Sequence, residues 1–166
     1  MATVTLQGKP QQTSGDLPKL GSHAPDFTLT KIDLSDVRLS DYAGRTLLLN
    51  IFPSVDTGTC AMAMRRFNEE ASKMANVTVL CISADLPFAQ KRFCAAENLT
   101  HVHPVSVFRH ADFGKQYGVL LTTGPLTGLL SRAVVILDGK SNVIYTQLVP
   151  EISAEPDYAA ALAMLS

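Results

Sequence analysis

Two apolar runs of strand length, separated by one amphipathic helix pattern, constrain the fold of this chain more than any other feature. The runs cover residues 47–52 and 77–82, and they lack the polar alternation of a half-exposed strand. Between them, apolar side chains recur at the fourth, seventh and eleventh positions after Cys60, which is helical spacing. The pattern predicts a βαβ unit whose two parallel strands are buried on both faces.

The segments on either side of this unit predict an α/β domain. Alternating residues within 1–14 predict an N-terminal β-hairpin extension. Residues 133–148 predict an antiparallel hairpin, and residues 157–165 predict a last helix. This order is typical of a thioredoxin-like fold, in which helices flank a central mixed sheet, and we expect a single domain over residues 1–166.

The composition excludes several classes of protein. The chain has 166 residues, of which 46% are hydrophobic and 17% charged, and its net charge is −1. This balance is that of a globular protein, and it gives no electrostatic support for a nucleic-acid partner. No stretch approaches the roughly 20 apolar residues of a membrane span, and no secretory signal is recognised. We therefore expect a soluble, cytoplasmic protein without a membrane partner, and a periplasmic location stays open.

The three cysteines do not predict a disulfide framework, because their number is odd and no Cys-x-x-Cys pair occurs. Cys60 differs from an inert thiol because it lies at the start of the predicted helix, directly after a Thr-Gly-Thr turn. The unpaired N–H groups and partial positive charge of a helix N-terminus favour the thiolate, which is the nucleophilic form. Thr57 adds a hydroxyl that can bond the sulfur or a bound oxygen. The carboxylate of Asp56 opposes thiolate formation, so it must point away or be offset by a cation.

Arg132 is the candidate for that cation. It begins an apolar strand, where a guanidinium is costly to bury unless it has a function or an ion pair. Near Cys60 it would lower the pKa of the thiol and bind the departing oxygen in the transition state. The alternative interpretation is a partly exposed arginine at the end of a strand, paired with a surface carboxylate.

Cys94 lies in a second predicted helix, which has Asp85 as its N-cap and Pro87 in its first turn. The predicted core stripe of this helix consists of Leu86, Ala89, Phe93 and Ala96. Cys94 lies about 100° around the helix from Phe93, so we expect it to be partly exposed. A thiol there could attack an oxidised Cys60. Because a disulfide needs Cα atoms within about 7 Å, we expect local unfolding of one or both helices during turnover.

The other candidate residues carry weaker signals. Cys81 lies inside the second apolar run and is interpreted as a core residue. His101 and His103 suggest zinc, but their spacing is not a familiar ligand pattern, so we expect no metal. No glycine-rich phosphate loop occurs, and no cofactor is expected.

One segment resembles the active-site signature of a known family. Its motif is Pro53-x-x-x-Thr57-x-x-Cys60, which is similar to the signature of the peroxiredoxins. The resemblance extends over essentially the whole chain. The segments that carry it are residues 50–60, 83–94 and 124–135. Within the peroxiredoxins, the chain is most similar in these segments to the bacterial thiol peroxidases, an atypical two-cysteine group.

The resemblance implies a role for five residues. Cys60 would be the peroxidatic cysteine and Cys94 the resolving cysteine, and the two would form an intramolecular disulfide. Thr57 and Arg132 would orient and activate the peroxide, and Pro53 would shield the thiolate and the sulfenic acid from solvent. No metal, haem or flavin is implied.

The function that the resemblance implies is the reduction of hydrogen peroxide and alkyl hydroperoxides by a homodimeric antioxidant enzyme that thioredoxin recycles. Two other interpretations stay open. A general thiol–disulfide oxidoreductase is disfavoured because the chain has no Cys-x-x-Cys pair. A non-catalytic thioredoxin-fold binding module would leave the pKa of Cys60 near the free value of about 8.5 and would not react with peroxide.

Overall fold

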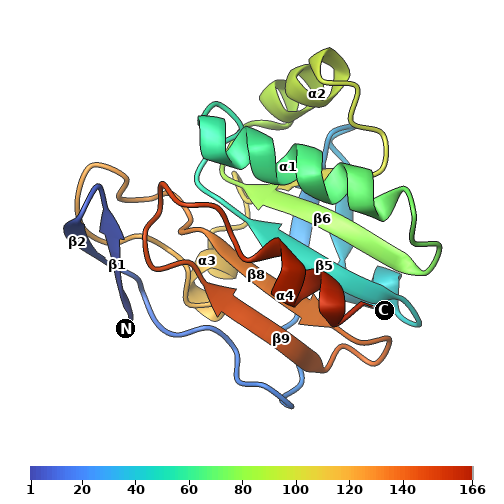
Figure 1. Cartoon of the computed structure of the whole chain (residues 1–166), viewed down its shortest axis with the longest axis horizontal. Helices are drawn as coiled ribbons and strands as arrows, with labels where there is room; N and C mark the ends of the chain where they lie inside the picture. Colours follow the sequence, from blue (N-terminus) through green and yellow to red (C-terminus); the bar gives the residue numbers. More distant parts are fainter. Residues whose placement is uncertain (166) are drawn as a thin grey trace.

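In the computed structural model, which describes residues 1–165, strand β5 (Thr46–Ile51) runs through the interior of a seven-stranded sheet (Figure 1). The other elements are β1 (Thr3–Leu6), β2 (Lys9–Gln12), β3 (Thr28–Lys31), β4 (Asp36–Arg38), the 3₁₀ helix η1 (Leu39–Tyr42), α1 (Gly58–Ala71), β6 (Val77–Ser83), α2 (Pro87–Ala96), β7 (His103–Ser106), α3 (Asp112–Gln116), β8 (Ala133–Leu137), β9 (Val143–Leu148) and α4 (Tyr158–Ala163). The strand order is β4-β3-β7-β6-β5-β8-β9. β5 is parallel to β6 and antiparallel to β8, so the sheet is mixed, as predicted.

Helix α1 connects β5 to β6 and lies over these two strands (Figure 1). It begins after Thr57, whose hydroxyl oxygen accepts the backbone N–H of Cys60 and so satisfies one of the unpaired donors of the first turn. The predicted apolar stripe is buried against the sheet at Cys60, Met64, Phe67 and Ala71. The predicted βαβ unit is therefore confirmed, and Cys60 lies in the first helical turn on the core side.

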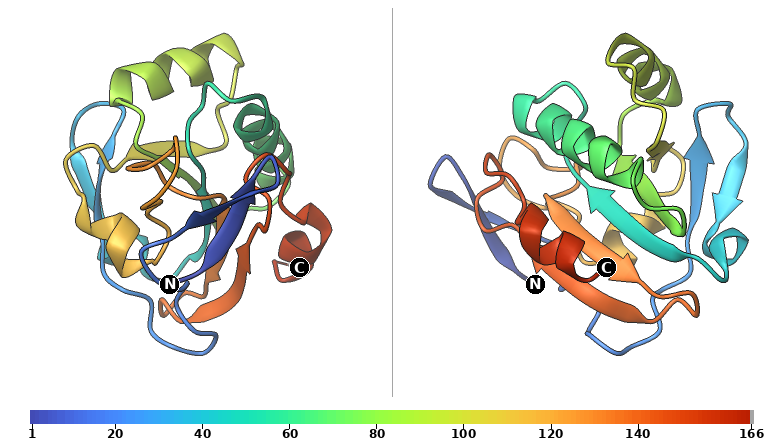
Figure 2. Two further views of the ribbon diagram at one scale, coloured as in Figure 1. Left: turned by 90° about the vertical axis from the view of Figure 1, so that its left-hand side faces the viewer. Right: turned by 45° about the vertical axis from the view of Figure 1, so that its right-hand side comes forward.

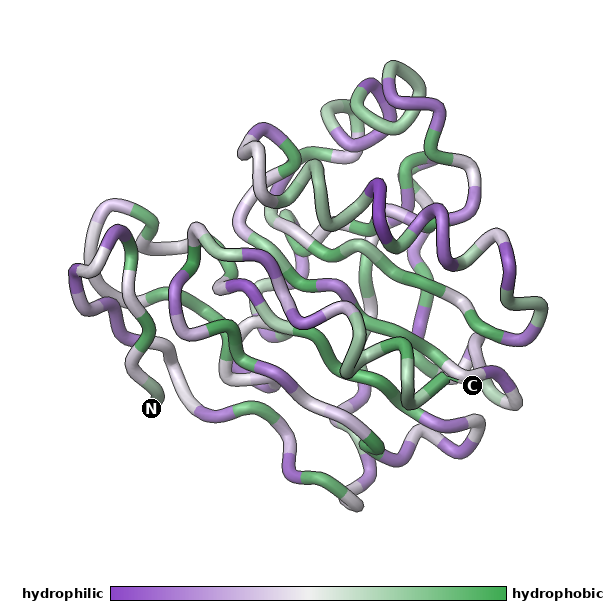
Figure 3. The backbone as a smooth tube through the Cα atoms, viewed as in Figure 1, coloured by the Kyte–Doolittle hydropathy of each residue, from purple (hydrophilic) through white to green (hydrophobic). Residues whose placement is uncertain are grey.

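Apolar side chains fill both faces of the sheet, and the central strands are correspondingly hydrophobic in Figure 3. On one face, Leu49 of β5 packs in a cluster with Phe113 of α3. On the other face, Leu48 packs in a cluster that contains residues of α1, α2 and α4 and all three cysteines. Within residues 1–165, no helix has the length and apolarity that crossing a bilayer requires.

The N-terminal hairpin, β1 and β2, packs against the loop that follows β9 (Figure 2). The backbone N–H of Thr5 donates to the carbonyl of Pro150 at 2.7 Å, and the N–H of Ile152 donates to the carbonyl of Thr5 at 2.8 Å. The Glu151 carboxylate accepts the Thr5 hydroxyl and the N–H of Gly8, both at 2.9 Å. The hairpin therefore fixes the conformation of the loop at residues 150–152.

The predicted buried face of α2 is confirmed at Phe93, which packs against the apolar cluster, and is wrong at two other positions. Leu86 is 52% exposed and Ala96 is also exposed, although both were expected in the core stripe. The side-chain amide of Gln90 donates to the carbonyl of Val105 in β7 at 2.9 Å, and this hydrogen bond turns a polar position toward the sheet. The residues that α2 buries are Pro87, Gln90 and Cys94.

Asp85 is not the N-cap of α2, and that prediction is also wrong. The N-cap is Leu86, followed by Pro87 at the first helical position. The carboxylate of Asp85 turns the other way and accepts the Ser54 hydroxyl at 2.7 Å and the N–H of Val55 at 2.8 Å. In the loop after β5 this carboxylate accepts charge-assisted hydrogen bonds from both a hydroxyl and a backbone N–H.

Candidate active site

Cys60 lies at the junction of β5 and α1, where the sequence predicts a reactive thiol. Its side chain is fully buried at 0% exposure. The N–H of Cys60 donates to the hydroxyl oxygen of Thr57 at 3.4 Å, and the same hydroxyl donates to the carbonyl of Ser54 at 3.2 Å. The first turn of α1 is also tied to the loop after β9, because the Thr59 hydroxyl donates to the carbonyl of Ser153 at 2.9 Å.

The loop that leads to Cys60 begins at Pro53, which is buried. Proline has no backbone N–H for the sheet ladder, which is consistent with the end of β5 at Ile51. Asp56, the residue whose charge would oppose a thiolate, is exposed, and its backbone N–H donates to the Ser54 hydroxyl at 3.1 Å. Water therefore solvates this carboxylate, as the sequence argument requires.

Arg132 lies at the same edge of the sheet as the Cys60 loop. The next residue, Ala133, pairs with Ile51 at the end of β5. The Arg132 side chain is 2% exposed, and its Nε donates to the carbonyl of Ile152 at 2.8 Å. Among residues 1–165, no carboxylate forms an ion pair with it, and its Nη1 has no hydrogen-bond partner.

This environment decides between the two interpretations of Arg132. The alternative, an exposed arginine paired with a surface carboxylate, is wrong, because the side chain is buried and, in the part of the chain described, unpaired. A buried guanidinium with a free N–H donor is costly unless a ligand or a transition state accepts the hydrogen bond. The Nη1 of Arg132 is therefore a buried donor that could bond to an oxygen atom.

The other two cysteines lie in the apolar cluster on the same face of the sheet as Cys60, and all three thiols are free. Burial raises the pKa of Cys81 to about 12, and its sulfur accepts the Asn50 side-chain N–H at 3.7 Å. This environment agrees with the predicted role of Cys81 as a core residue. Cys94 is 8% exposed rather than partly exposed, and burial raises its pKa to about 11.

The sequence analysis missed a polar group that borders the Cys60 loop. Asp85 accepts a third hydrogen bond, from the Ser83 hydroxyl at 2.6 Å, and the Ser83 oxygen in turn accepts the Gln90 side-chain N–H at 3.2 Å. A signal for this group existed in the sequence. Ser83 is the last residue of a buried parallel strand and Asp85 follows it, and the carboxyl ends of such strands are where polar site residues gather.

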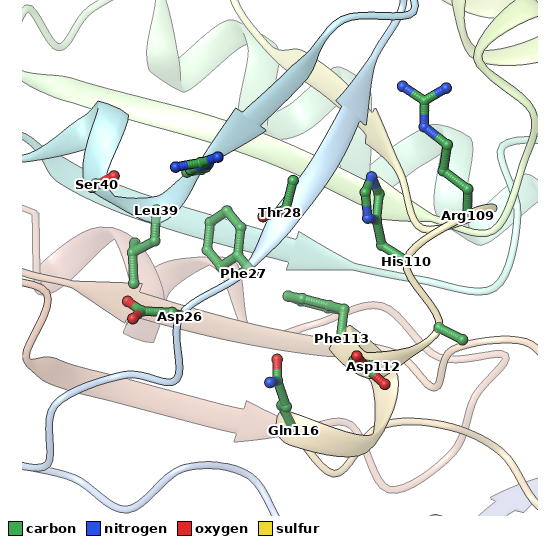
Figure 4. Close-up of a pocket in the computed structure, with 12 residues that line it drawn as sticks. Asp26, Phe27, Thr28, Leu39, Ser40, Arg109, His110, Asp112, Phe113 and Gln116 are labelled. Carbon is green, nitrogen blue, oxygen red and sulfur yellow. The ribbon is translucent and has the colours of Figure 1, made fainter.

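A polar groove of about 640 Å³ lies between the β3–β4 ribbon and α3 (Figure 4). None of the five predicted site residues lines it. Two of the residues that line it, Arg109 and His110, contact the Asp36 carboxylate at 2.8 and 3.2 Å. Both side chains therefore have a partner within the protein.

We expect the contacts of Asp36 to make stability fall with acid between about pH 4 and pH 2. The hydrogen bonds from Arg109 and His110 lower the pKa of Asp36 from 3.8 to about 2. A carboxyl whose pKa is depressed by folding contributes stability that is full above its unfolded pKa and is lost as the pH falls through the folded pKa.

Thermal melts of the wild type and Asp36→Asn from pH 7 to pH 2 test this expectation. The wild type should melt at the higher temperature at pH 7, by less than about 4 °C because the pair is exposed. The difference should shrink toward zero at pH 2. An equal difference at both pH values would contradict the assignment.

No group of three or more metal-ligating side chains gathers among the described residues. His103 lies in β7, where burial lowers its pKa and nearby Arg45 and Lys31 act in the same direction. A neutral imidazole beside two cations does not form part of a cluster of anionic ligands. The polar and reactive groups at the Cys60 end of the sheet are the Cys60 thiol, the Thr57 hydroxyl and the Arg132 guanidinium.

A buried thiol at a helix N-terminus, on a mixed sheet flanked by helices and with a buried arginine at the same edge, defines the class of thiol-dependent redox proteins. The redoxin family model matches residues 19–162. A thiol peroxidase from Corynebacterium glutamicum is 53% identical over 166 residues, which cover 100% of both chains.

Solved structures agree with these matches. A peroxiredoxin-like protein from Aquifex aeolicus superimposes with a TM-score of 0.94 at 39% identity, covering 99% of this chain and 96% of that chain. A thiol peroxidase from Chromobacterium violaceum gives a TM-score of 0.91 at 24% identity with the same coverage, and this likeness concerns the fold.

The chain therefore belongs to the redoxin family, and within that family it is a thiol peroxidase, an enzyme that reduces peroxides with a thiol. The predictions of a thioredoxin-like fold and of a peroxiredoxin function are confirmed. The family model begins at residue 19, so the N-terminal hairpin lies outside it, whereas the C. glutamicum relative matches the chain over the hairpin as well.

Proposed function

We propose that the thiolate of Cys60 attacks the terminal oxygen of a hydroperoxide. The sulfur gives two electrons as the S–O bond forms and the O–O bond breaks, so Cys60 becomes a sulfenic acid and the leaving oxygen takes up a proton as water or an alcohol. The observation that carries this proposal is the position of Cys60 in the first turn of α1, where its N–H donates a hydrogen bond to the capping hydroxyl of Thr57.

Three further residues are proposed to support this step. Arg132 presents a buried guanidinium with one free N–H donor, which suits the charge that develops on the leaving oxygen. The Thr57 hydroxyl lies beside the N–H of Cys60 and can turn toward a bound peroxide. Pro53 is buried at the start of the loop and excludes water from the sulfur without needing a partner for an N–H.

Cys94 is proposed to resolve the sulfenic acid. Its thiolate attacks the Cys60 sulfur, the S–S bond forms, the S–O bond breaks, and the oxygen leaves as water. The dithiol of thioredoxin then supplies two electrons by thiol–disulfide exchange and returns both cysteines to the reduced state. Because Cys94 is buried in a separate helix, we propose that one or both helices open locally before the disulfide forms.

One equivalent of cumene hydroperoxide added to the reduced protein tests this proposal, with the disulfides then mapped by mass spectrometry. We expect a Cys60–Cys94 disulfide in the wild type and in Cys81→Ser, and a Cys60 sulfenic acid without an intramolecular disulfide in Cys94→Ser. Thioredoxin should sustain turnover of the first two proteins and not of the third. A general thiol–disulfide oxidoreductase would reduce insulin disulfides and consume no peroxide, which would contradict the proposal.

The homodimer that the resemblance implies and the cytoplasmic location expected from the sequence stay predictions. Neither follows from the thiol motif, and the proposed catalytic cycle requires neither of them.

A further inference from the structure

Asp85 connects the segments that precede the two helices carrying Cys60 and Cys94. It lies between β6 and α2, and its carboxylate accepts hydrogen bonds from three donors in two segments. Two donors, the Ser54 hydroxyl and the N–H of Val55, belong to the loop between β5 and α1. Hydrogen bonds to a carboxylate are stronger than bonds between neutral groups, so these contacts hold the loop more firmly than a neutral acceptor would.

The contacts of Asp85 continue to the peroxidatic thiol through the backbone. The carbonyl of Ser54 accepts the N–H of Thr57 at 3.3 Å and its hydroxyl at 3.2 Å. The Thr57 oxygen then accepts the N–H of Cys60 at 3.4 Å. A displacement of Ser54 would therefore move the cap of α1 and the first helical turn with it.

On its other side, Asp85 is fixed to the sheet and to α2. The Ser106 hydroxyl at the end of β7 donates to the backbone carbonyl of Asp85 at 2.5 Å. The Ser83 hydroxyl donates a hydrogen bond to the carboxylate, and its oxygen accepts the side-chain N–H of Gln90 in α2 at 3.2 Å. The carboxylate thus holds the Cys60 loop against a rigid group of buried polar residues.

We propose that Asp85 is a positioning residue that holds the Cys60 loop in the closed conformation, and that release of Ser54 and Val55 from its carboxylate is part of the opening that precedes disulfide formation. This inference rests on the proposed function, in which peroxide reacts with the closed form and Cys94 with the open form. Weakening the hydrogen bonds of this carboxylate must therefore lower the rate of the reaction with peroxide and raise the rate of disulfide formation.

The substitution Asp85→Asn tests the inference, because asparagine keeps the shape of the side chain and replaces one acceptor oxygen with a donor NH₂. In a Cys94→Ser background, we expect the rate of sulfenic acid formation at Cys60 to fall about 10-fold, the factor expected when one charge-assisted hydrogen bond is lost. With Cys94 present, we expect the sulfenic acid to convert to the disulfide several times faster than in the wild type. Rapid quenching, trapping of the sulfenic acid and mass spectrometry measure both rates.

Asp138→Asn is the matched control. Its carboxylate accepts the N–H groups of Lys140 and Asn142, both at 2.9 Å, in the hairpin between β8 and β9, at the opposite end of β5 from the Cys60 loop. This variant should leave both rates at the wild-type values.

Opposite changes in the two rates of Asp85→Asn, absent from Asp138→Asn, support the positioning role. Unchanged rates, or two rates that fall together with the melting temperature, overturn it. Absence of a disulfide in the wild type would instead contradict the proposed role of Cys94, and the sulfenic acid rate in the Cys94→Ser background would then decide whether Asp85 holds the loop.

Discussion

Replacement of Cys60 by serine is expected to reduce peroxide consumption to the protein-free background. A serine at this position keeps the backbone hydrogen bond to Thr57. Its hydroxyl, however, stays protonated at neutral pH and is a far weaker nucleophile than a thiolate. The fold should persist, because the change is nearly isosteric at a buried position. Peroxide remaining after incubation, measured with a ferrous-oxidation assay, gives the result directly.

Cys81→Ser is the control for this prediction. It makes the same chemical change in the same apolar cluster, and the new hydroxyl can accept the N–H that Asn50 donates to the sulfur of Cys81. We expect this variant to keep wild-type turnover. Peroxide consumption that survives in Cys60→Ser would show that another thiol is the nucleophile.

The second large effect is expected at Arg132. In Arg132→Met, we expect kcat/KM for peroxide to fall about 100- to 1,000-fold, the range found when one preorganised donor to a transition-state oxygen is removed. Methionine has an apolar side chain of similar length, so it fills the buried space while removing the guanidinium. The melting temperature should stay the same or rise, because the variant no longer buries an uncompensated charge.

Arg45→Met separates this effect from the general loss of a cation. Arg45 precedes the start of β5, at the opposite end of the strand from the Cys60 loop, and its Nε donates to the Thr78 hydroxyl at 2.6 Å. Its replacement should leave kcat/KM unchanged. An active Arg132→Met, or an Arg45→Met as impaired as Arg132→Met, would remove the proposed role of Arg132.

The central sheet and α1 were predictable because local sequence and tertiary environment agree there. The strands β5 and β6 are buried on both faces, so nearly all of their residues are apolar. The runs are also too short for typical helices, so their length indicates strands. The stripe from Cys60 to Ala71 faces the sheet over its whole length. The site motif was predictable for the same reason, because Thr57 and Cys60 belong to one turn and their contact is local.

The orientation of α2 was not predictable in this way, because its buried face depends on partners far along the chain. Gln90 is buried through its hydrogen bond to Val105, fifteen residues away, and a polar residue at that position breaks the apolar period. Asp85 likewise finds its donors in a loop thirty residues earlier. Spacing within the helix carries no information about either contact.

Ion pairs likewise cannot be predicted reliably from spacing within one helix. Arg65 and Glu69 have the i,i+4 spacing that favours an ion pair along α1, but the Arg65 guanidinium instead forms two hydrogen bonds of 2.9 Å with Glu97 at the end of α2. A planar guanidinium gains more from a bidentate carboxylate on a neighbouring helix than from a single contact along its own helix. Arg66 and Glu70, which have the same spacing, do form an ion pair at 3.6 Å.

The burial of Cys94 imposes an order on the chemical steps. While the protein is closed, a pKa of about 11 keeps this thiol protonated at neutral pH, so it neither competes for peroxide nor attacks a disulfide at an appreciable rate. Exposure to water on opening would return the pKa toward 9.0 and raise the thiolate fraction about 100-fold. The same opening movement would thus bring the Cys94 sulfur to Cys60 and make it reactive. Peroxide would therefore react only with the Cys60 sulfur in each cycle.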